Sequence, residues 1–128
     1  ITGNKRDVNR YKWNYKSISK KLNNKNSKQS IFFQKISNLL SVRRKQKAFH
    51  PNASRRIINL GSKIFSFKRI SIDRKQTIIC ITNLSSITQR TKLDKVYRNW
   101  NNLVGSKIQV NDNLLILKPF ETIWLSNR

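Results

Sequence analysis

The sequence predicts an α+β chain in which helices precede an all-β antiparallel region. Three observations lead to this prediction. A helical repeat of apolar residues is confined to the first part of the 128 residues, residues 60–128 contain short runs rich in Ile, Phe, Thr and Trp, and no helical pattern separates these runs. Strands at short spacing without intervening helices indicate an antiparallel sandwich or a small barrel.

Two helices are predicted before the strands, with a polar loop between them. Residues 16–24 fit a short polar helix, and residues 27–47 carry a stronger helical signal, with Ser27 or Ser30 as its cap. Four apolar residues of the second segment fall at i, i+4, i+7 and i+8: Phe32, Ile36, Leu39 and Leu40. This apolar stripe needs a partner, which must be the β region or protein that the chain lacks.

The predicted strands begin after His50 and Pro51. Residues 63–70 and 76–83 flank the turn-like sequence Asp-Arg-Lys at 73–75 and predict a hairpin. The remaining predicted strands are residues 88–93, 107–110, 114–117 and 122–125.

The charge of the chain is strongly basic, with 28 Lys and Arg against five Asp and Glu, a net charge of +23 and a pI near 11.3. Such an excess favours a small nucleic-acid-binding protein of ribosomal type, whose binding would fall steeply with salt. AT-rich codon usage is a second explanation for the high Lys content, because Lys, Asn and Ile are all encoded by AT-rich codons. Together they make up 49 of the 128 residues. It leaves the scarcity of acidic residues unexplained.

Residues that could carry catalysis are scarce. A hydrolytic triad or a zinc site needs several His, Cys or acidic groups, whereas the chain has one His and one Cys. Its three glycines are spread along the chain, which excludes a glycine-rich phosphate-binding loop. The sequence therefore predicts no catalytic residue, no metal ligand and no cofactor, and His50 is interpreted as a packed or capping residue. Cys80 alone cannot form an internal disulfide, which indicates a cytoplasmic setting. No apolar run is long enough to span a membrane.

A third class of function, a carbohydrate-binding or purely structural β module, rests on Trp100 and Trp124. Trp124 alternates like a core residue, so a packed role is the interpretation that its position favours.

Four segments carry a resemblance to a known family in their order along the chain: residues 2–10, 48–53, 78–85 and 117–125. The first reads TGNKRDVNR, the second AFHPNA, and the last ends the chain in a predicted hairpin. In this order they resemble the C-terminal end of sucrose phosphorylase-type enzymes of the alpha-amylase superfamily, glycoside hydrolase family thirteen, whose members include glucosylglycerate phosphorylases. The resemblance runs through essentially the whole chain.

The resemblance implies a division of the chain. In the family a (β/α)8 barrel carries the chemistry at the C-terminal ends of its strands, and an all-β domain follows. Residues 1–56 would be the end of the barrel, consisting of the loop after strand eight and the final helix. Residues 57–128 would be the antiparallel C-terminal β sandwich. The chain would then be a fragment, and its unpartnered helix would be the last barrel helix.

The resemblance also implies a function for the intact parent, which would transfer glucose from an α-glucoside such as sucrose to phosphate. The partners it implies are the α-glucoside, phosphate and the missing barrel portion, with no membrane. Arg6 matches the family arginine that reaches into the glucose-binding subsite, and Asp7, Asn9 and Arg10 would hold the loop. The catalytic carboxylates of the family have no counterpart here, so the chain alone is expected to be inactive.

Overall fold

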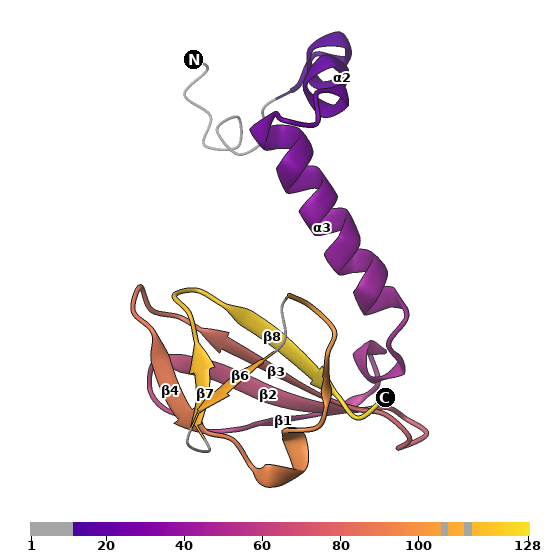
Figure 1. The fold of residues 1–128 in the computed structure, drawn as a ribbon. Helices are drawn as coiled ribbons and strands as arrows, with labels where there is room; N and C mark the ends of the chain where they lie inside the picture. Colours follow the sequence, from indigo (N-terminus) through magenta and orange to yellow (C-terminus); the bar gives the residue numbers. More distant parts are fainter. Residues whose placement is uncertain (1–11, 106–107, 112–113) are drawn as a thin grey trace, which may run out of the picture. The chain divides into compact units, whose positions relative to one another are not determined.

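A computed structural model describes residues 12–105, 108–111 and 114–128 of the chain. The chain divides into two compact units, Ile1–Leu39 and Leu40–Arg128. Described helical structure makes up most of the first unit, and the strands belong to the second (Figure 1).

Both predicted helices are present. Helix α2 (Tyr15–Asn23) begins after Asn14, whose side chain accepts a backbone N–H of the first turn at 3.2 Å. Helix α3 (Lys28–Arg44) begins after Ser27, whose Oγ accepts the backbone N–H of Ser30 at 3.0 Å. Ser27 is therefore the cap, and Ser30 lies inside the helix. Within the described part of the chain, neither helix combines the length and apolar character needed to cross a membrane.

The second unit consists of two antiparallel sheets. Among the described residues the strand order is β1-β2-β3-β8-β5 in one sheet and β4-β7-β6 in the other. The strand bounds are β1 (Ser54–Ile57), β2 (Ile64–Ile70), β3 (Thr77–Asn83), β4 (Gln89–Lys92), β5 (Asn101–Asn102), β6 (Gln109–Asn111), β7 (Leu114–Leu117) and β8 (Thr122–Ser126). The antiparallel prediction is confirmed, and the arrangement is a sandwich rather than a small barrel (Figure 1).

Two strands, β1 and β5, were not predicted. Strand β1 carries two adjacent arginines and β5 consists of two asparagines, so neither has the apolar alternation that indicates a strand. Each lies at an edge of the five-stranded sheet and pairs with a single neighbour, β2 or β8. Backbone hydrogen bonds to an existing sheet therefore define these strands, and charged residues are common at such edges.

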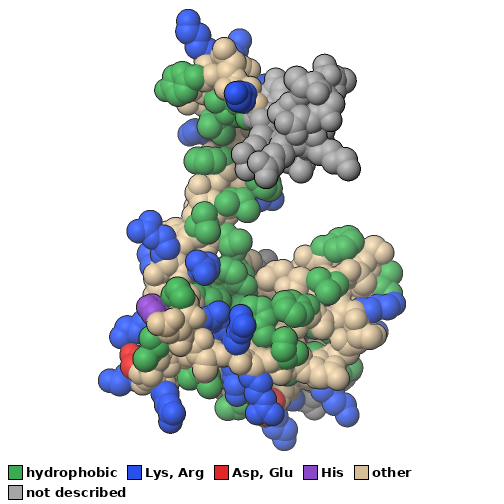
Figure 2. Space-filling model, turned by 180° about the vertical axis from the view of Figure 1, so that it is seen from behind, with side chains coloured by type: hydrophobic (Ala, Val, Ile, Leu, Met, Phe, Trp, Pro, Cys, Tyr) green, Lys and Arg blue, Asp and Glu red, His purple; other side chains and the backbone are tan. Residues whose placement is uncertain are grey.

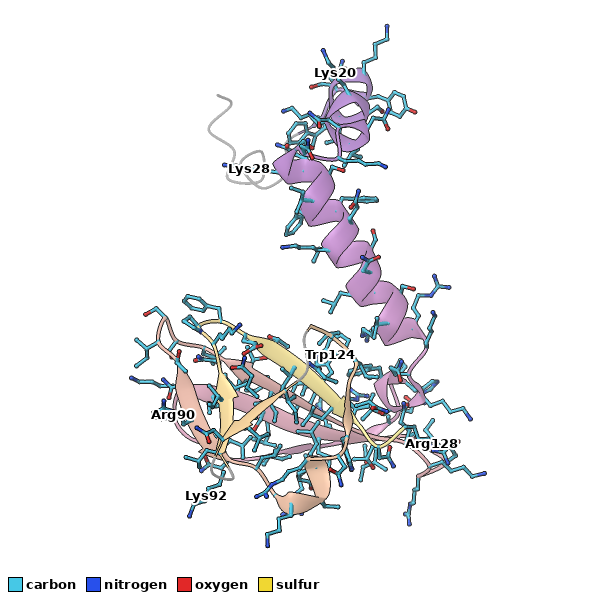
Figure 3. The ribbon with its side chains drawn as sticks, in the orientation of Figure 1. Lys20, Lys28, Arg90, Lys92, Trp124 and Arg128 are labelled. Atoms are coloured by element: carbon cyan, nitrogen blue, oxygen red, sulfur yellow. The ribbon has the colours of Figure 1, made fainter. Side chains whose placement is uncertain are left out.

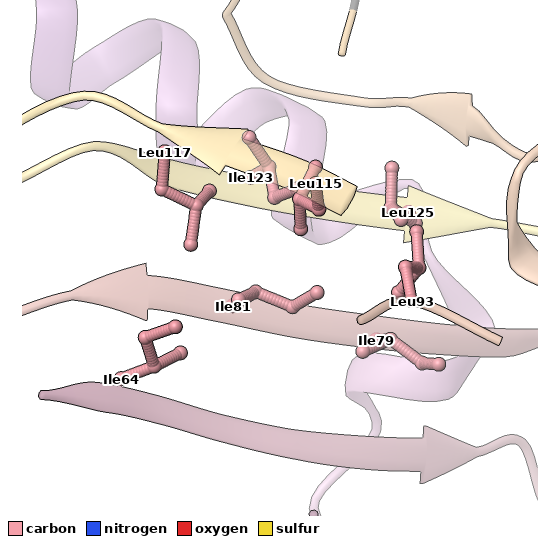
Figure 4. Close-up of a cluster of buried hydrophobic side chains, with 8 residues drawn as sticks. All are labelled: Ile64, Ile79, Ile81, Leu93, Leu115, Leu117, Ile123 and Leu125. Atoms are coloured by element: carbon pink, nitrogen blue, oxygen red, sulfur yellow. The ribbon is translucent and has the colours of Figure 1, made fainter. Parts of the chain in front are cut away.

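The main core lies between the two sheets, where side chains from both inner faces meet (Figure 4). Leu115 and Leu117 of β7 are 0% and 1% exposed, and they face Ile81 of β3 and Ile123 of β8 in the same cluster. The alternation of buried residues along β7 and β8 follows from the period of two in a strand. The cluster comprises Ile64, Ile79, Ile81, Leu93, Leu115, Leu117, Ile123 and Leu125.

A second, smaller cluster covers part of the outer face of the five-stranded sheet. The 3₁₀ helix η1 (Lys47–Phe49) places Ala48 and Phe49 against Ile78 and Cys80 of β3. Trp124 of β8 (Figure 3) is half-buried, and its ring meets that of Phe49 edge-to-face at 4.8 Å between centroids. The packed role predicted for Trp124 is confirmed.

Candidate functional site

Arg6, the predicted substrate-binding residue, lies outside the described residues, as do Asp7, Asn9 and Arg10. What the structure describes is the environment of the other motif segments. We refer to residues 46–53, which contain the AFHPNA motif and follow α3, as the junction segment.

Arg69 of β2 binds the junction segment through three backbone carbonyls. Its Nε donates to the carbonyl of Ala48 at 2.8 Å, and its terminal nitrogen donates to those of His50 at 2.6 Å and Ala53 at 3.4 Å. A planar guanidinium can serve several acceptors at once from one position. One side chain therefore holds both ends of the AFHPNA motif against the sheet.

Gln76, which is 8% exposed and directly precedes β3, binds the same segment. Its Oε1 accepts the backbone N–H of Ala48 at 3.0 Å, and its Nε2 donates to Oε1 of Gln46 at 2.7 Å. A third hydrogen bond, at 3.4 Å, joins Nε2 to Oγ of Ser126 on β8. The buried amide is thus satisfied, as a polar group in this position requires.

Asp73 lies in the turn between β2 and β3 and forms a salt bridge with Lys47 at 3.1 Å. The pKa of its carboxyl lies well below the usual range, mainly because Ser71 Oγ donates to it at 2.6 Å, with further hydrogen bonds from the Lys75 N–H and from Lys47. A lowered pKa means that its stabilising contribution is present above the ordinary Asp range and is lost only in strong acid. Asp73 is therefore a structural anion and not a proton donor.

His50 is exposed, and its Nδ1 accepts the backbone N–H of Asn52 at 3.2 Å. It is a capping residue, as predicted. In residues 12–105, 108–111 and 114–128, no three His, Cys, Asp or Glu side chains form a group that could hold a metal ion.

Cys80 is expected to resist alkylation in the folded chain. It is a free thiol, 3% exposed, and burial raises its pKa to about 12 despite the opposing effect of Arg69. Since the thiolate is the reactive form, iodoacetamide at pH 8 should label Cys80 slowly in the native chain and rapidly in urea, as followed by mass spectrometry. Rapid native labelling would contradict this burial.

The outer face of the five-stranded sheet retains an uncovered area beside the junction segment. Phe65 and Ile57 are 46% and 70% exposed, and with Phe67, Arg55 and other residues they line a depression of about 490 Å³. Phe65 and Phe67 lie 5.5 Å apart between ring centroids. Large apolar side chains exposed together are typical of an interaction surface.

Helix α3 also exposes apolar side chains. Phe32, Phe33 and Leu40 are 67%, 58% and 50% exposed. At about 100° per residue, the apolar positions from Ile31 to Val42 cover more than half of the helix circumference. Helices with so broad an apolar surface are usually buried against other protein.

Basic side chains occur on many of the described elements. Figure 2 shows Lys and Arg scattered over the visible face, and Figure 3 labels cations on separate elements, including Lys20 on α2, Lys28 on α3 and Arg90 on β4. On the face that Figure 2 shows, the described basic side chains do not form the continuous stripe that tracks a nucleic-acid backbone.

The two-sheet fold is that of a class of β domain found in several solved structures of enzymes. The structure resembles the alpha-glucosyl transfer enzyme XgtA, with a TM-score of 0.65 and 15% identity over 87% of this chain and 20% of that one. It also resembles the trehalulose synthase MutB of Pseudomonas mesoacidophila MX-45 (TM-score 0.62, 16% identity, 84% and 19% covered). A third likeness is to the alpha-amylase of H. orenii (TM-score 0.61, 20% identity, 87% and 22% covered).

The sequence is similar to two glucosylglycerate phosphorylases. The enzyme of Spirochaeta thermophila is 31% identical over 88 residues, which are 69% of this chain and 15% of that protein. The enzyme of Escherichia coli K12 is 25% identical over 127 residues, covering 96% and 21%. No protein-family model matches the chain. The chain belongs to the alpha-amylase superfamily, as its motifs predicted, and it spans about a fifth or less of the length of these relatives. None of these similarities supports the nucleic-acid hypothesis.

Proposed function

We propose that the chain is the C-terminal part of a sucrose phosphorylase-like glucosyltransferase that moves glucose from an α-glucoside to phosphate. The observation that carries the proposal is the similarity to two glucosylglycerate phosphorylases, one of which extends over 96% of the chain. Since the chain spans only 15% and 21% of these proteins, the activity belongs to a longer protein of which this chain would be one portion.

In this proposal residues 1–56 end the catalytic barrel and residues 57–128 form the β domain that follows it. Two features, one in each part, support a partner that this chain does not contain. The apolar side chains of α3 are exposed, and the outer face of the five-stranded sheet exposes Phe65 and Ile57. Burial of these surfaces against the remainder of the barrel would remove apolar area from water and stabilise the assembly.

Arg6 would donate hydrogen bonds from the loop to sugar hydroxyls and to a neighbouring carboxylate, which its guanidinium fork suits better than an ammonium group would. The nucleophile and the general acid would come from the rest of the barrel, because a retaining double displacement needs two carboxyl groups that face the same glycosidic bond. Within the described residues, the acidic side chains instead serve turns and caps: Asp73, Asp94 and Glu121.

A chimera tests this proposal. The segment of the Escherichia coli glucosylglycerate phosphorylase that aligns with this chain would be replaced by residues 1–128, and phosphate-dependent cleavage of glucosylglycerate would be measured. We expect a folded, active chimera in which Arg6→Lys lowers kcat/KM by about tenfold or more. The neighbouring Lys5→Gln is the control and should change kcat/KM less than twofold. A chimera that melts cooperatively but shows no activity would contradict the proposal.

The isolated chain should self-associate through α3. Replacing Phe32, Phe33 and Leu40 by Gln removes the most exposed apolar groups of the helix, so sedimentation velocity should show a shift toward monomer. The matched control replaces Leu84 and Ile87, which are 61% and 55% exposed in the β domain, and should leave association unchanged. In the chimera the same α3 changes should destabilise the protein. If the isolated chain is monomeric before any substitution, that result would contradict the proposal that α3 packs against protein outside this chain.

A further inference from the structure

A groove at one end of the sandwich has no role in the function proposed above. It has a volume of about 420 Å³ and opens where β1 and β2 meet the segment that follows β4. Its floor is apolar, because Ile79 and Leu93 are 1% and 4% exposed there, and Ile58, Leu60 and Tyr97 also line it. This volume suits a small organic ligand.

Two cations face one another at the groove. Arg56 of β1 and Lys68 of β2 are directly opposite in the antiparallel register, so their side chains lie on the same face of the sheet. Like charges in this position destabilise a sheet. In the part of the chain that the structure describes, neither side chain has a hydrogen-bond or salt-bridge partner, and Lys68 is half-buried. The pair therefore presents an unsatisfied positive charge above an apolar floor.

The other polar groups of the lining restrict what this charge can hold. Tyr97 contributes a hydroxyl, and Asp94 is the acid of the lining, with Oδ1 accepting the Val96 N–H at 3.2 Å. Lys92 also lines the groove. A carboxylate in the lining disfavours a long polyanion, which would place phosphates along the whole groove. It does provide an acceptor for a ligand hydroxyl.

We propose that this groove binds the phosphate monoester of a sugar or similar polyol. Arg56 and Lys68 hold the phosphate, Asp94 accepts a hydroxyl of the polyol, and the apolar floor and the Tyr97 ring contact its carbon face. The proposal does not depend on Arg6, because every residue that lines the groove lies between positions 56 and 97. It therefore stands whether or not the chain belongs to a phosphorylase.

Equilibrium dialysis of the full 128-residue chain against radiolabelled glucose 6-phosphate tests the proposal. At an ionic strength of about 0.15 M, where charges separated by more than about 8 Å are largely screened, we expect saturable binding of one equivalent. Inorganic phosphate should compete, and unlabelled glucose should not. Arg56→Gln and Lys68→Gln should each weaken binding about tenfold or more, since each removes a charged hydrogen-bond donor.

The matched control is Arg55→Gln. Arg55 precedes Arg56 on β1, but it lies opposite Arg69 and does not line the groove. The substitution removes the same charge and should change binding less than twofold. Arg56→Gln and Lys68→Gln should melt no earlier than the unmodified chain, because each relieves a like-charge pair, so lost binding would not reflect unfolding. Equal weakening by Arg55→Gln and Arg56→Gln, or the absence of saturable binding, would overturn the proposal.

Discussion

Replacing Asn83 by Asp is expected to lower the free energy of unfolding by about 3 kcal/mol or more. Asn83, at the end of β3, is 0% exposed. Its Nδ2 donates to three backbone carbonyls, those of Ile87 at 2.8 Å, Lys118 at 2.9 Å and Leu117 at 3.3 Å. Its Oδ1 accepts from the N–H and Oγ of Ser85 at 2.9 and 2.7 Å. The substitution keeps the shape but turns a carboxylate oxygen toward those carbonyls.

The measurement is urea unfolding followed by circular dichroism, repeated across pH. A buried carboxyl has a raised pKa, so the destabilisation should grow as the pH rises above the ordinary Asp value of about 3.9. Asn127→Asp is the control, because Asn127 is exposed and its Oδ1 only accepts the Thr77 N–H, at 2.8 Å. A carboxylate performs that role equally well, so a change within about 0.5 kcal/mol is expected. Similar losses at both positions would contradict this account of Asn83.

Replacing Arg69 by Met should lower the free energy of unfolding by about 2–3 kcal/mol, since three carbonyls of the junction segment lose a charged donor. The aliphatic stem is kept, which separates the hydrogen bonds from the packing. Hydrogen exchange should also increase in residues 46–53 more than in β3 or β8. Arg69→Lys should recover only part of the loss, because one ammonium cannot reproduce the planar fork.

The control for Arg69 is the residue directly opposite it, Arg55. Arg55 is exposed and has no hydrogen-bond or salt-bridge partner among the described side chains, so Arg55→Met should change stability by about 0.5 kcal/mol at most. Unchanged exchange in residues 46–53 of the Arg69→Met chain would show that this side chain does not hold the junction segment.

Asn83 and Arg69 together give the family-like motifs a physical role. Asn83 links the segment at 78–85 to the backbone at the start of the segment at 117–125. Arg69 holds both ends of the segment at 48–53. Three of the four motif segments thus take part in the packing of the β domain. Within the described residues, the motifs that identify the family in the sequence are therefore also the segments whose contacts hold the β domain together.

Much of the fold follows from local sequence. The cap at Ser27 and the helix that follows it depend on residues within a few positions of one another. The hairpin of β2 and β3 depends on alternating residues around a short turn, and β7 has the predicted bounds, residues 114–117.

Tertiary structure alone decided the edge strands, the polar contacts and the groove. Arg69 binds carbonyls 16 to 21 positions away, Gln76 binds groups up to 50 positions away, and Asn83 reaches 35 positions. No local pattern marks these residues, because a Gln or an Asn beside a turn looks like any polar loop residue until its partners are brought to it. Likewise, Arg56 and Lys68 become opposed only through the register of β1 on β2, which the backbone of the assembled sheet establishes.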